Sequence, residues 1–309
     1  MTALLRTATP ADEPALRALW DTCFDAPQIA ALYALDPDRH RHTFVAQSAP
    51  DGSIDAVVVY VPRLIRDVHG TPRRVGGIGS VATRPEARGQ GLVRRLLAEA
   101  ERTMLAEECA WSLLFTGTPG VYRSSGWQEF RSTYTEGTIT PAPPAGTHRV
   151  REATAADGGA VAGLHGAANA ARPLSSLRAP EDWAVRVPAW YGPPERALVA
   201  EDPVTGEPVG WLVAQYTGEY AEVREFAGAP GCLDDLLGAV AARARAGGLT
   251  RARVRLPGTP SRAGWPALLT EPRSVDEQVG MARPLLAAPE AVRATVTAPG
   301  AVHWYGDCF

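Results

Sequence analysis

The chain contains two copies of one N-terminal pattern, and this repeat limits its fold more than any other feature. Leu5–Asp12 (LRTATPAD) aligns with Val150–Asp157 (VREATAAD) at an offset of 145 residues, and an Ala/Leu-rich helical pattern follows both. A chain of 309 residues is long enough for two domains of roughly 150 residues each. We therefore expect two tandem copies, residues 1–145 and 146–309, joined by a Pro- and Gly-containing linker over 140–147.

Hydrophobic periodicity and turn signals predict an α+β fold, in which each copy is a mixed, mostly antiparallel sheet flanked by helices. A hairpin with a turn at Asp51-Gly52 is a strong local signal, and the second copy has a similar hairpin around Thr205-Gly206. The elements expected in the first copy are strands at 3–7, 43–62 (a hairpin), 75–83, 111–116 and 127–139, and helices at 11–24, 26–34, 91–107 and 119–125. A last strand is expected at 279–286.

Composition narrows the classes of partner. The 31 Lys+Arg against 34 Asp+Glu give a net charge of −3, so no overall cationic surface favours nucleic acid. The four cysteines and six histidines show no metal-ligand or catalytic-triad spacing, which predicts free thiols and no metal. No signal-peptide pattern opens the sequence and no uncharged run approaches the roughly 20 residues of a membrane span, so we expect a cytoplasmic protein.

A glycine-containing turn between a strand and an amphipathic helix is the most informative segment. It runs from Val81 to Val93, with Gly89 and Gly91 just before the helix and Arg88 beside them. A helix N-terminus exposes unpaired N–H groups and the positive end of its dipole. Glycines let an anion approach that backbone, so the geometry suits a pyrophosphate.

The sequence resembles the GNAT superfamily of N-acyltransferases. Arg88–Val93 (RGQGLV) resembles its acetyl-CoA signature, and Val121–Trp127 (VYRSSGW) resembles the aromatic element that follows one helix and one strand later. Val93 stands where the signature has Gly or Ala. The Arg-Gly-Leu-hydrophobic version resembles the Eis type of acetyltransferase, although this chain is too short to hold the sterol-carrier-like third domain of that type.

The resemblance implies acetyl-CoA as cosubstrate. It implies that backbone N–H groups at Val81, Ala82 and Thr83 bind the acyl carbonyl. The remaining residues implied for the cosubstrate are Arg88, Gly89, Gln90, Gly91, Leu92, Val93, Gly117 and Thr118.

The second copy lacks the signature. Its equivalent segment, Gly228–Asp235 (GAPGCLDD), has no Arg-x-x-Gly-x pattern, and Asp234 and Asp235 would repel a pyrophosphate at the helix start. We expect a catalytic N-terminal copy and a degenerate C-terminal copy.

Two residues are expected to move protons. By resemblance, Tyr122 is the general acid that protonates the departing thiolate. The chain ends in a strongly aromatic segment, His303–Phe309 (HWYGDCF), where termini are usually polar. Resemblance to the Eis type implies that the terminal carboxylate of Phe309 enters the N-terminal site and accepts the amine proton; the alternative is that these aromatics only hold the domains together.

The acceptor is not specified by the sequence. Trp20 and Asp25 could belong to an aromatic and acidic wall for a cationic amine of a small molecule or peptide, whereas Trp20 could equally be core. Two other hypotheses are an acyltransferase that takes its donor from aminoacyl-tRNA or a carrier protein in natural-product biosynthesis, with the Arg-rich stretch 243–255 as a binding face, and a non-catalytic binding or regulatory protein of the same fold. Resemblance also allows a homo-oligomer.

Overall fold

The structure, a computed structural model, describes residues 3–26, 28–48, 53–143, 146–191, 195–257 and 265–309. The chain forms two units: unit 1 is Met1–Phe130, Gln278–Thr297 and Asp307–Phe309, and unit 2 is Arg131–Glu277 and Ala298–Gly306. The expected turn at Asp51-Gly52 and the expected boundary at residue 145 lie outside the described residues.

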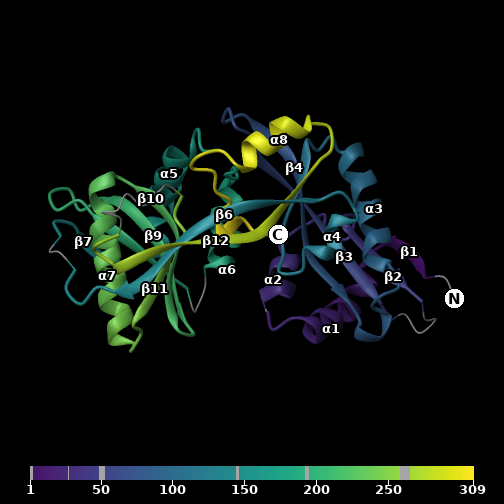
Figure 1. The fold of residues 1–309 in the computed structure, drawn as a ribbon, viewed down its shortest axis with the longest axis horizontal. Coiled ribbons are helices and arrows are strands. Elements are labelled where there is room, and N and C mark those ends of the chain that lie inside the picture. Colours follow the sequence, from purple (N-terminus) through teal and green to yellow (C-terminus); the bar gives the residue numbers. More distant parts are fainter. Residues whose placement is uncertain (1–2, 27, 49–52, 144–145, 192–194, 258–264) are drawn as a thin grey trace. The chain divides into compact units, whose positions relative to one another are not determined.

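Unit 1 is a sheet with strand order β1-β2-β3-β4-β5-β12 and helices on both faces (Figure 1). Its pairs are antiparallel, except that β4 and β5 run parallel. The elements in chain order are β1 (Leu4–Thr7), α1 (Glu13–Cys23), α2 (Gln28–Ala34), β2 (Thr43–Gln47), β3 (Ala56–Arg66), β4 (Pro72–Thr83), α3 (Leu92–Ala106), β5 (Trp111–Phe115), α4 (Gly120–Arg123), the first residues of β6 (Gln128–Ile139), the last residues of β12 (Leu269–Pro284) and α8 (Pro289–Val296).

The alternation of side chains along β3 divides the core of unit 1 into two layers. Ala56, Val58 and Tyr60 pack with the buried stripe of α3, whereas Val57 and Val59 pack with α1. Neighbouring residues of a strand point to opposite faces, so α3 and α1 cover opposite sides of the sheet. The amphipathic helix expected at 91–107 has a buried stripe at four-residue spacing, formed by Leu92, Leu96, Ala100 and Met104.

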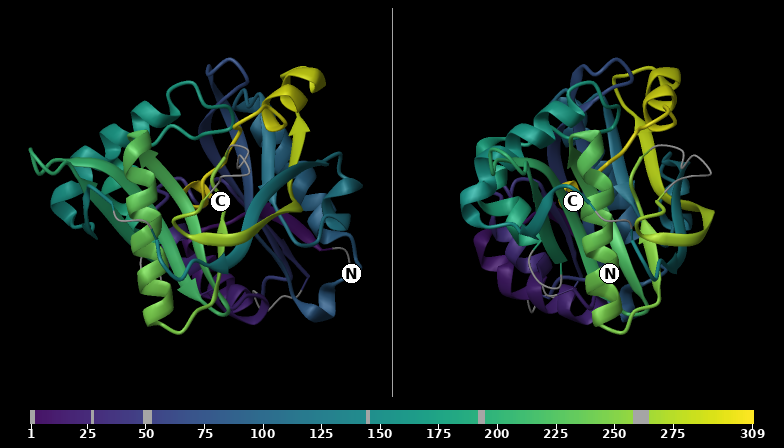
Figure 2. Two further views of the ribbon diagram at one scale, coloured as in Figure 1. Left: turned by 60° about the vertical axis from the view of Figure 1, so that its left-hand side comes forward. Right: turned by 90° about the vertical axis from the view of Figure 1, so that its left-hand side faces the viewer.

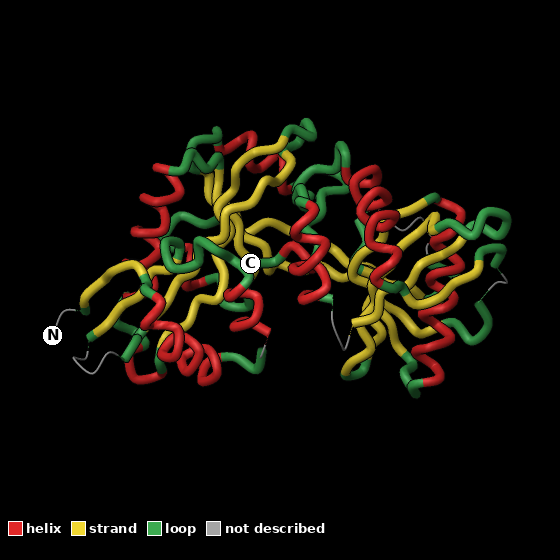
Figure 3. The backbone as a smooth tube through the Cα atoms, turned by 180° about the vertical axis from the view of Figure 1, so that it is seen from behind, coloured by secondary structure: helices red, strands yellow, loops and turns green. Residues whose placement is uncertain are grey.

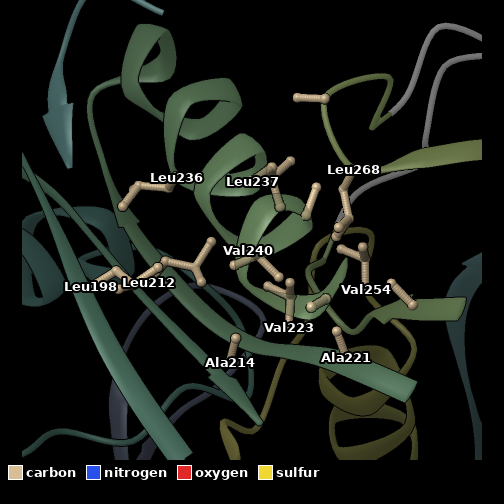
Figure 4. Close-up of a cluster of buried hydrophobic side chains, with 14 of the residues drawn as sticks. Leu198, Leu212, Ala214, Ala221, Val223, Leu236, Leu237, Val240, Val254 and Leu268 are labelled. Atoms are coloured by element: carbon tan, nitrogen blue, oxygen red, sulfur yellow. The ribbon is translucent and has the colours of Figure 1, made fainter. Parts of the chain in front are cut away.

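Unit 2 repeats this plan, with strand order β6-β11-β10-β9-β8-β7 and with β10 parallel to β11. Helix α7 runs along these strands in both views of Figure 2, and Figure 3 shows helices around the strands of each unit. Its core gathers Leu198, Leu212, Val223, Leu236 and Val240 between α7 and the sheet (Figure 4). The elements are β7 (Arg149–Glu152), α5 (Gly158–Asn169), α6 (Val187–Trp190), β8 (Glu195–Glu201), β9 (Pro208–Thr217), β10 (Tyr220–Gly228), α7 (Leu233–Ala246) and β11 (Arg251–Val254).

The sequence repeat has a physical basis in each unit. The Asp12 carboxylate accepts hydrogen bonds from Nη1 and Nη2 of Arg6, each at 2.7 Å, and from the backbone N–H of Thr9 at 2.7 Å. Asp157 makes the same contacts with Arg151, at 2.8 and 2.7 Å, and with Thr154, at 2.7 Å. The repeated Thr-x-x-Asp is thus a capping motif that fixes the entry of α1 and of α5.

The sheet of each unit is completed by a strand from the other half of the sequence: β6 in unit 2 and β12 in unit 1. β6, which follows the first copy in sequence, pairs antiparallel with β11 over Thr135–Thr138 in unit 2. β12, which follows the second copy, pairs antiparallel with β5 over Gly280–Pro284 in unit 1. The closing strands expected over 127–139 form a single strand, β6, and the last strand begins at Leu269 rather than at residue 279. Among the described residues, no helix is both long and apolar enough to cross a membrane.

Candidate active site

A β-bulge interrupts β4 close to its end. Val59 of β3 is opposite Gly79 and Val57 is opposite Ala82, so Ser80 and Val81 share a single partner position. Ser80 has a φ of 50°, a left-handed conformation that a non-glycine residue seldom adopts. A bulge of this kind removes backbone groups from the ladder and makes them accessible to a ligand.

The glycine loop follows directly after β4. Gly89 and Gly91 have φ values of +78° and +69°, and α3 begins at Leu92. A Cβ atom at Gly89 would meet nothing within 4 Å, so this backbone is open to an approaching group. Arg88 and Gln90 are exposed, whereas Leu92 and Val93 pack toward the core, so Leu92 and Val93 can offer a ligand only their backbone. The loop therefore has the features of an anion site at a helix start.

Tyr122 is buried on α4, just after β5. Burial raises the pKa of Tyr122 to about 12, while a hydrogen bond with the Thr116 side chain acts in the opposite direction. Thr116 Oγ1 also accepts the backbone N–H of Thr118 at 3.0 Å. Gly117, which lies between them, has open space where a Cβ would be. The phenol therefore stays protonated at neutral pH and is held at the end of β5.

Phe309 lies on β4, beside the bulge. A Cβ atom at Gly77 would come 2.0 Å from the Phe309 ring, and one at Gly79 would come 2.5 Å from its carbonyl carbon and oxygen. The ring also stacks on Phe115, with centroids 6.5 Å apart. Because Phe115 and Thr116 are consecutive, the residues that contact Phe309 and Tyr122 are neighbours at the end of β5.

Trp20 and Asp25, the two residues considered for binding the acceptor, differ in exposure to solvent. Trp20 is 3% exposed, and its indole nitrogen donates to Ser80 O at 2.9 Å, so it contacts the bulge from within the core. Asp25 is exposed beyond the end of α1, and the structure gives it no hydrogen bond or ion pair with a described residue. Sequence reasoning missed the link between Trp20 and Ser80, and an aromatic residue within a helical stripe gives no signal of such a bond.

Unit 2 has a bulge at the corresponding strand, but a charged network fills it. The register of β10 shifts between Val223 and Glu225. Glu225 is fully buried, lies 2.9 Å from Arg178 Nη2 and 3.3 Å from His165 Nε2, and accepts the Tyr191 hydroxyl. At the start of α7, Asp235 accepts the backbone N–H of His148 at 2.9 Å. This bulge is therefore occupied by the chain's own side chains.

One family model matches part of the chain. Residues 5–130 match the model of an acetyltransferase (GNAT) domain. No curated protein sequence matches the chain.

Three solved structures resemble the chain over most of its length. One, from Enterococcus faecalis V583, is described as a conserved protein of unknown function and probable N-acyltransferase; it is 16% identical, has a TM-score of 0.74, and the match covers 93% of this chain and 73% of that one. A GCN5-related N-acetyltransferase from Anabaena variabilis ATCC 29413 is 14% identical, with a TM-score of 0.68 and coverage of 92% and 73%. Eis1 from Mycobacterium abscessus is 14% identical, with a TM-score of 0.61 and coverage of 92% and 74%.

At these identities the structures inform on the fold alone, whereas the domain match supports acyl transfer as a general class of activity for residues 5–130. The chain thus contains a match to the GNAT acetyltransferase domain in residues 5–130 and has the fold of the GCN5-related N-acetyltransferases.

Proposed function

We propose that unit 1 transfers the acetyl group of acetyl-CoA to a primary amine of a small molecule or peptide. The observation that carries this proposal is the position of Phe309. The carbon and oxygen of its carboxylate lie against Gly79, next to the β4 bulge. The glycine loop follows the same strand, and Tyr122 is held at the end of the neighbouring β5.

Acetyl-CoA fits the open backbone of this region. The pyrophosphate would be held by the backbone N–H groups at the start of α3 and by exposed Arg88, where glycines with positive φ leave room for it. The thioester carbonyl would accept hydrogen bonds from backbone N–H groups of Val81 to Thr83 at the bulge. Gly117 and Thr118, directly after β5, would flank the same substrate.

The proposed reaction is direct transfer. The neutral amine attacks the thioester carbonyl carbon, a C–N bond forms, and the oxyanion is stabilised at the bulge. The C–S bond then breaks, Tyr122 protonates the departing thiolate, and the carboxylate of Phe309 accepts the proton of the amine. Transfer of that proton back to the Tyr122 phenolate restores both groups, so the products are the amide and free CoA thiol.

The proposed acceptor is a cationic amine. Asp25 is exposed after α1 and would attract a cationic amine before it is deprotonated. Trp20 contributes through the bulge rather than through an exposed ring face, because it is buried.

A C-terminal extension tests the role of Phe309. Adding Gly-Ser-Gly-Ser after Phe309 moves the carboxylate away from Gly79, and turnover should fall by roughly 10²–10⁴-fold, as for loss of a general base. The affinity for CoA should stay within about twofold, because the glycine loop is untouched. The same extension at the N-terminus is the control. Unchanged turnover in the C-terminal variant would contradict the carboxylate role.

A donor carried on tRNA would need free cations. In the Arg-rich stretch, Arg251 and Arg253 are ion-paired with Glu136, at 3.3 and 3.0 Å, and Arg255 is ion-paired with Glu222 at 2.7 Å. These carboxylates compensate the positive charge that would release counterions from a nucleic acid. Release of free thiol from acetyl-CoA with a panel of amines, measured with and without charged tRNA, separates the two donors. Transfer from charged tRNA releases no CoA thiol, so the aminoacylated amine is measured separately, and absence of both thiol release and aminoacyl transfer would favour a non-catalytic protein.

A further inference from the structure

The indole N–H of Trp20 bonds the one bulge residue whose backbone conformation is strained. Trp20 Nε1 donates to Ser80 O at 2.9 Å, and Ser80 has a φ of 50°. A left-handed conformation is unfavourable for a non-glycine residue, so the surrounding structure must hold it in place. One helical turn further along, Cys23 Sγ lies 3.5 Å from Thr83 O, so α1 contacts both sides of the bulge.

Because the peptide bond is planar, this hydrogen bond also orients the backbone N–H of the next residue, Val81. The Ser80 carbonyl and the Val81 N–H belong to one trans peptide plane and point in opposite directions. A bond that fixes Ser80 O toward α1 therefore directs the Val81 N–H away from α1. It also polarises the peptide, which strengthens the N–H as a donor.

The second copy supplies an internal comparison. His165 stands eight residues after Asp157, as Trp20 stands eight residues after Asp12, so the two side chains occupy the same position of α5 and α1. His165 also faces its bulge, where its Nε2 lies 3.3 Å from the buried carboxylate of Glu225. The same helix position thus reaches the bulge in both units, and in unit 1 it binds the carbonyl of a bulge residue.

We propose that Trp20 is a positioning residue that orients the Val81 N–H toward the oxyanion of the acetyl-transfer reaction. This inference rests on the proposed function, in which the Val81 N–H binds the thioester carbonyl. Trp20 itself contacts neither substrate.

The variant Trp20→Phe removes the N–H and keeps an aromatic ring against Tyr33, whose ring centroid lies 5.0 Å away. Removal of one oxyanion donor costs about 10²–10³-fold in kcat, so a misdirected donor should cost about 10- to 100-fold. The KM for acetyl-CoA should change less than twofold. Replacement of Trp20 by β-(3-benzothienyl)alanine, which has the shape of tryptophan without the N–H, should lower kcat equally and excludes an effect of the smaller ring.

Trp111→Phe is the matched control. Trp111 is 2% exposed, in the same unit, and its indole nitrogen has no hydrogen-bond partner among the described residues. This variant therefore loses the same atoms but no hydrogen bond, and its kcat should stay near that of the wild type.

Hydrogen–deuterium exchange of the free protein separates this inference from the proposed function. Exchange over residues 80–83 should be faster in the Trp20 variants than in wild type and Trp111→Phe. Equal exchange in all proteins, or an unchanged kcat in both Trp20 variants, would overturn the positioning role. A wild-type protein that releases no thiol with any amine would contradict the proposed function instead, while the exchange comparison would still decide whether Trp20 holds the bulge.

Discussion

Phe309 lies so close to Gly79 that a Cβ atom on this glycine would come 2.5 Å from the carbonyl carbon of Phe309. Real Cβ atoms do not approach other atoms to this distance, so the terminal residue can occupy its place only because β4 has glycines there. Gly77 has the same relation to the aromatic ring, at 2.0 Å. The two glycines form the surface on which Phe309 rests.

Gly77→Ala should displace Phe309 without unfolding unit 1. The added methyl group overlaps the ring of Phe309, which must move. We expect turnover to fall at least about tenfold, because a displacement of about 1 Å in a catalytic group can cost up to 100-fold. CoA affinity, measured by calorimetry, should be retained. Gly163→Ala is the control, since a Cβ there meets nothing within 4 Å; equal turnover in both variants would refute the role of Phe309's position.

Tyr122→Phe should lower kcat by roughly 10²–10⁴-fold while acetyl-CoA still binds, since it removes the proton donor and keeps the buried ring. Burial raises the pKa of Tyr122 to about 12, so the phenol keeps its proton as the pH rises through 10. The wild-type profile of kcat should therefore show no alkaline decline below about pH 10 from this group. A decline between pH 8 and 9 that disappears in Tyr122→Phe would contradict the raised pKa, and an unchanged kcat in Tyr122→Phe would contradict the role as proton donor.

Asp12→Asn and Asp157→Asn should destabilise their own units by similar amounts, because the two carboxylates have the same partners. Asn keeps an acceptor oxygen but loses the charge-assisted hydrogen bonds from Arg6 or Arg151, and hydrogen bonds to charged groups contribute about 1.5–3 kcal/mol. Hydrogen bonds from Arg6 and Arg151 hold the pKa of each carboxyl below its usual range. A carboxyl whose pKa is lower in the folded protein than in the unfolded chain stabilises the fold at pH values above the unfolded-chain pKa of about 4. This stabilisation is lost as the pH falls from there toward the pKa of the folded protein.

Thermal unfolding at pH 7 and at pH 3 measures this effect. The difference in stability between wild type and each variant should shrink at pH 3. If the difference in stability between wild type and variant were the same at pH 7 and pH 3, the charge of the carboxylates would not contribute to stability.

The local elements were predictable because their signals are local. The repeated octapeptide and the Ala/Leu-rich pattern after it marked α1 and α5, amphipathic periodicity marked α3, and glycines marked the loop before it. Each of these depends on residues within a few positions of one another.

The exchange of β6 and β12 was not predictable. Alternation identifies a strand but not its partner, and β5 pairs with residues about 170 positions later in the chain. The bond from Trp20 to Ser80 was hidden for the same reason, since it joins residues 60 positions apart and gives no periodic signal.

Calorimetric titration with acetyl-CoA is the most direct test of the claim that unit 1 holds the acetyl-CoA site and unit 2 does not. We predict one site per chain. Gly91→Val should weaken binding at least about tenfold, because a β-branched residue is strained at a φ of +69°. Gly231→Val, in the corresponding loop of unit 2, should bind like wild type. Two sites per chain, no binding, or equal affinity in wild type and Gly91→Val would contradict the account.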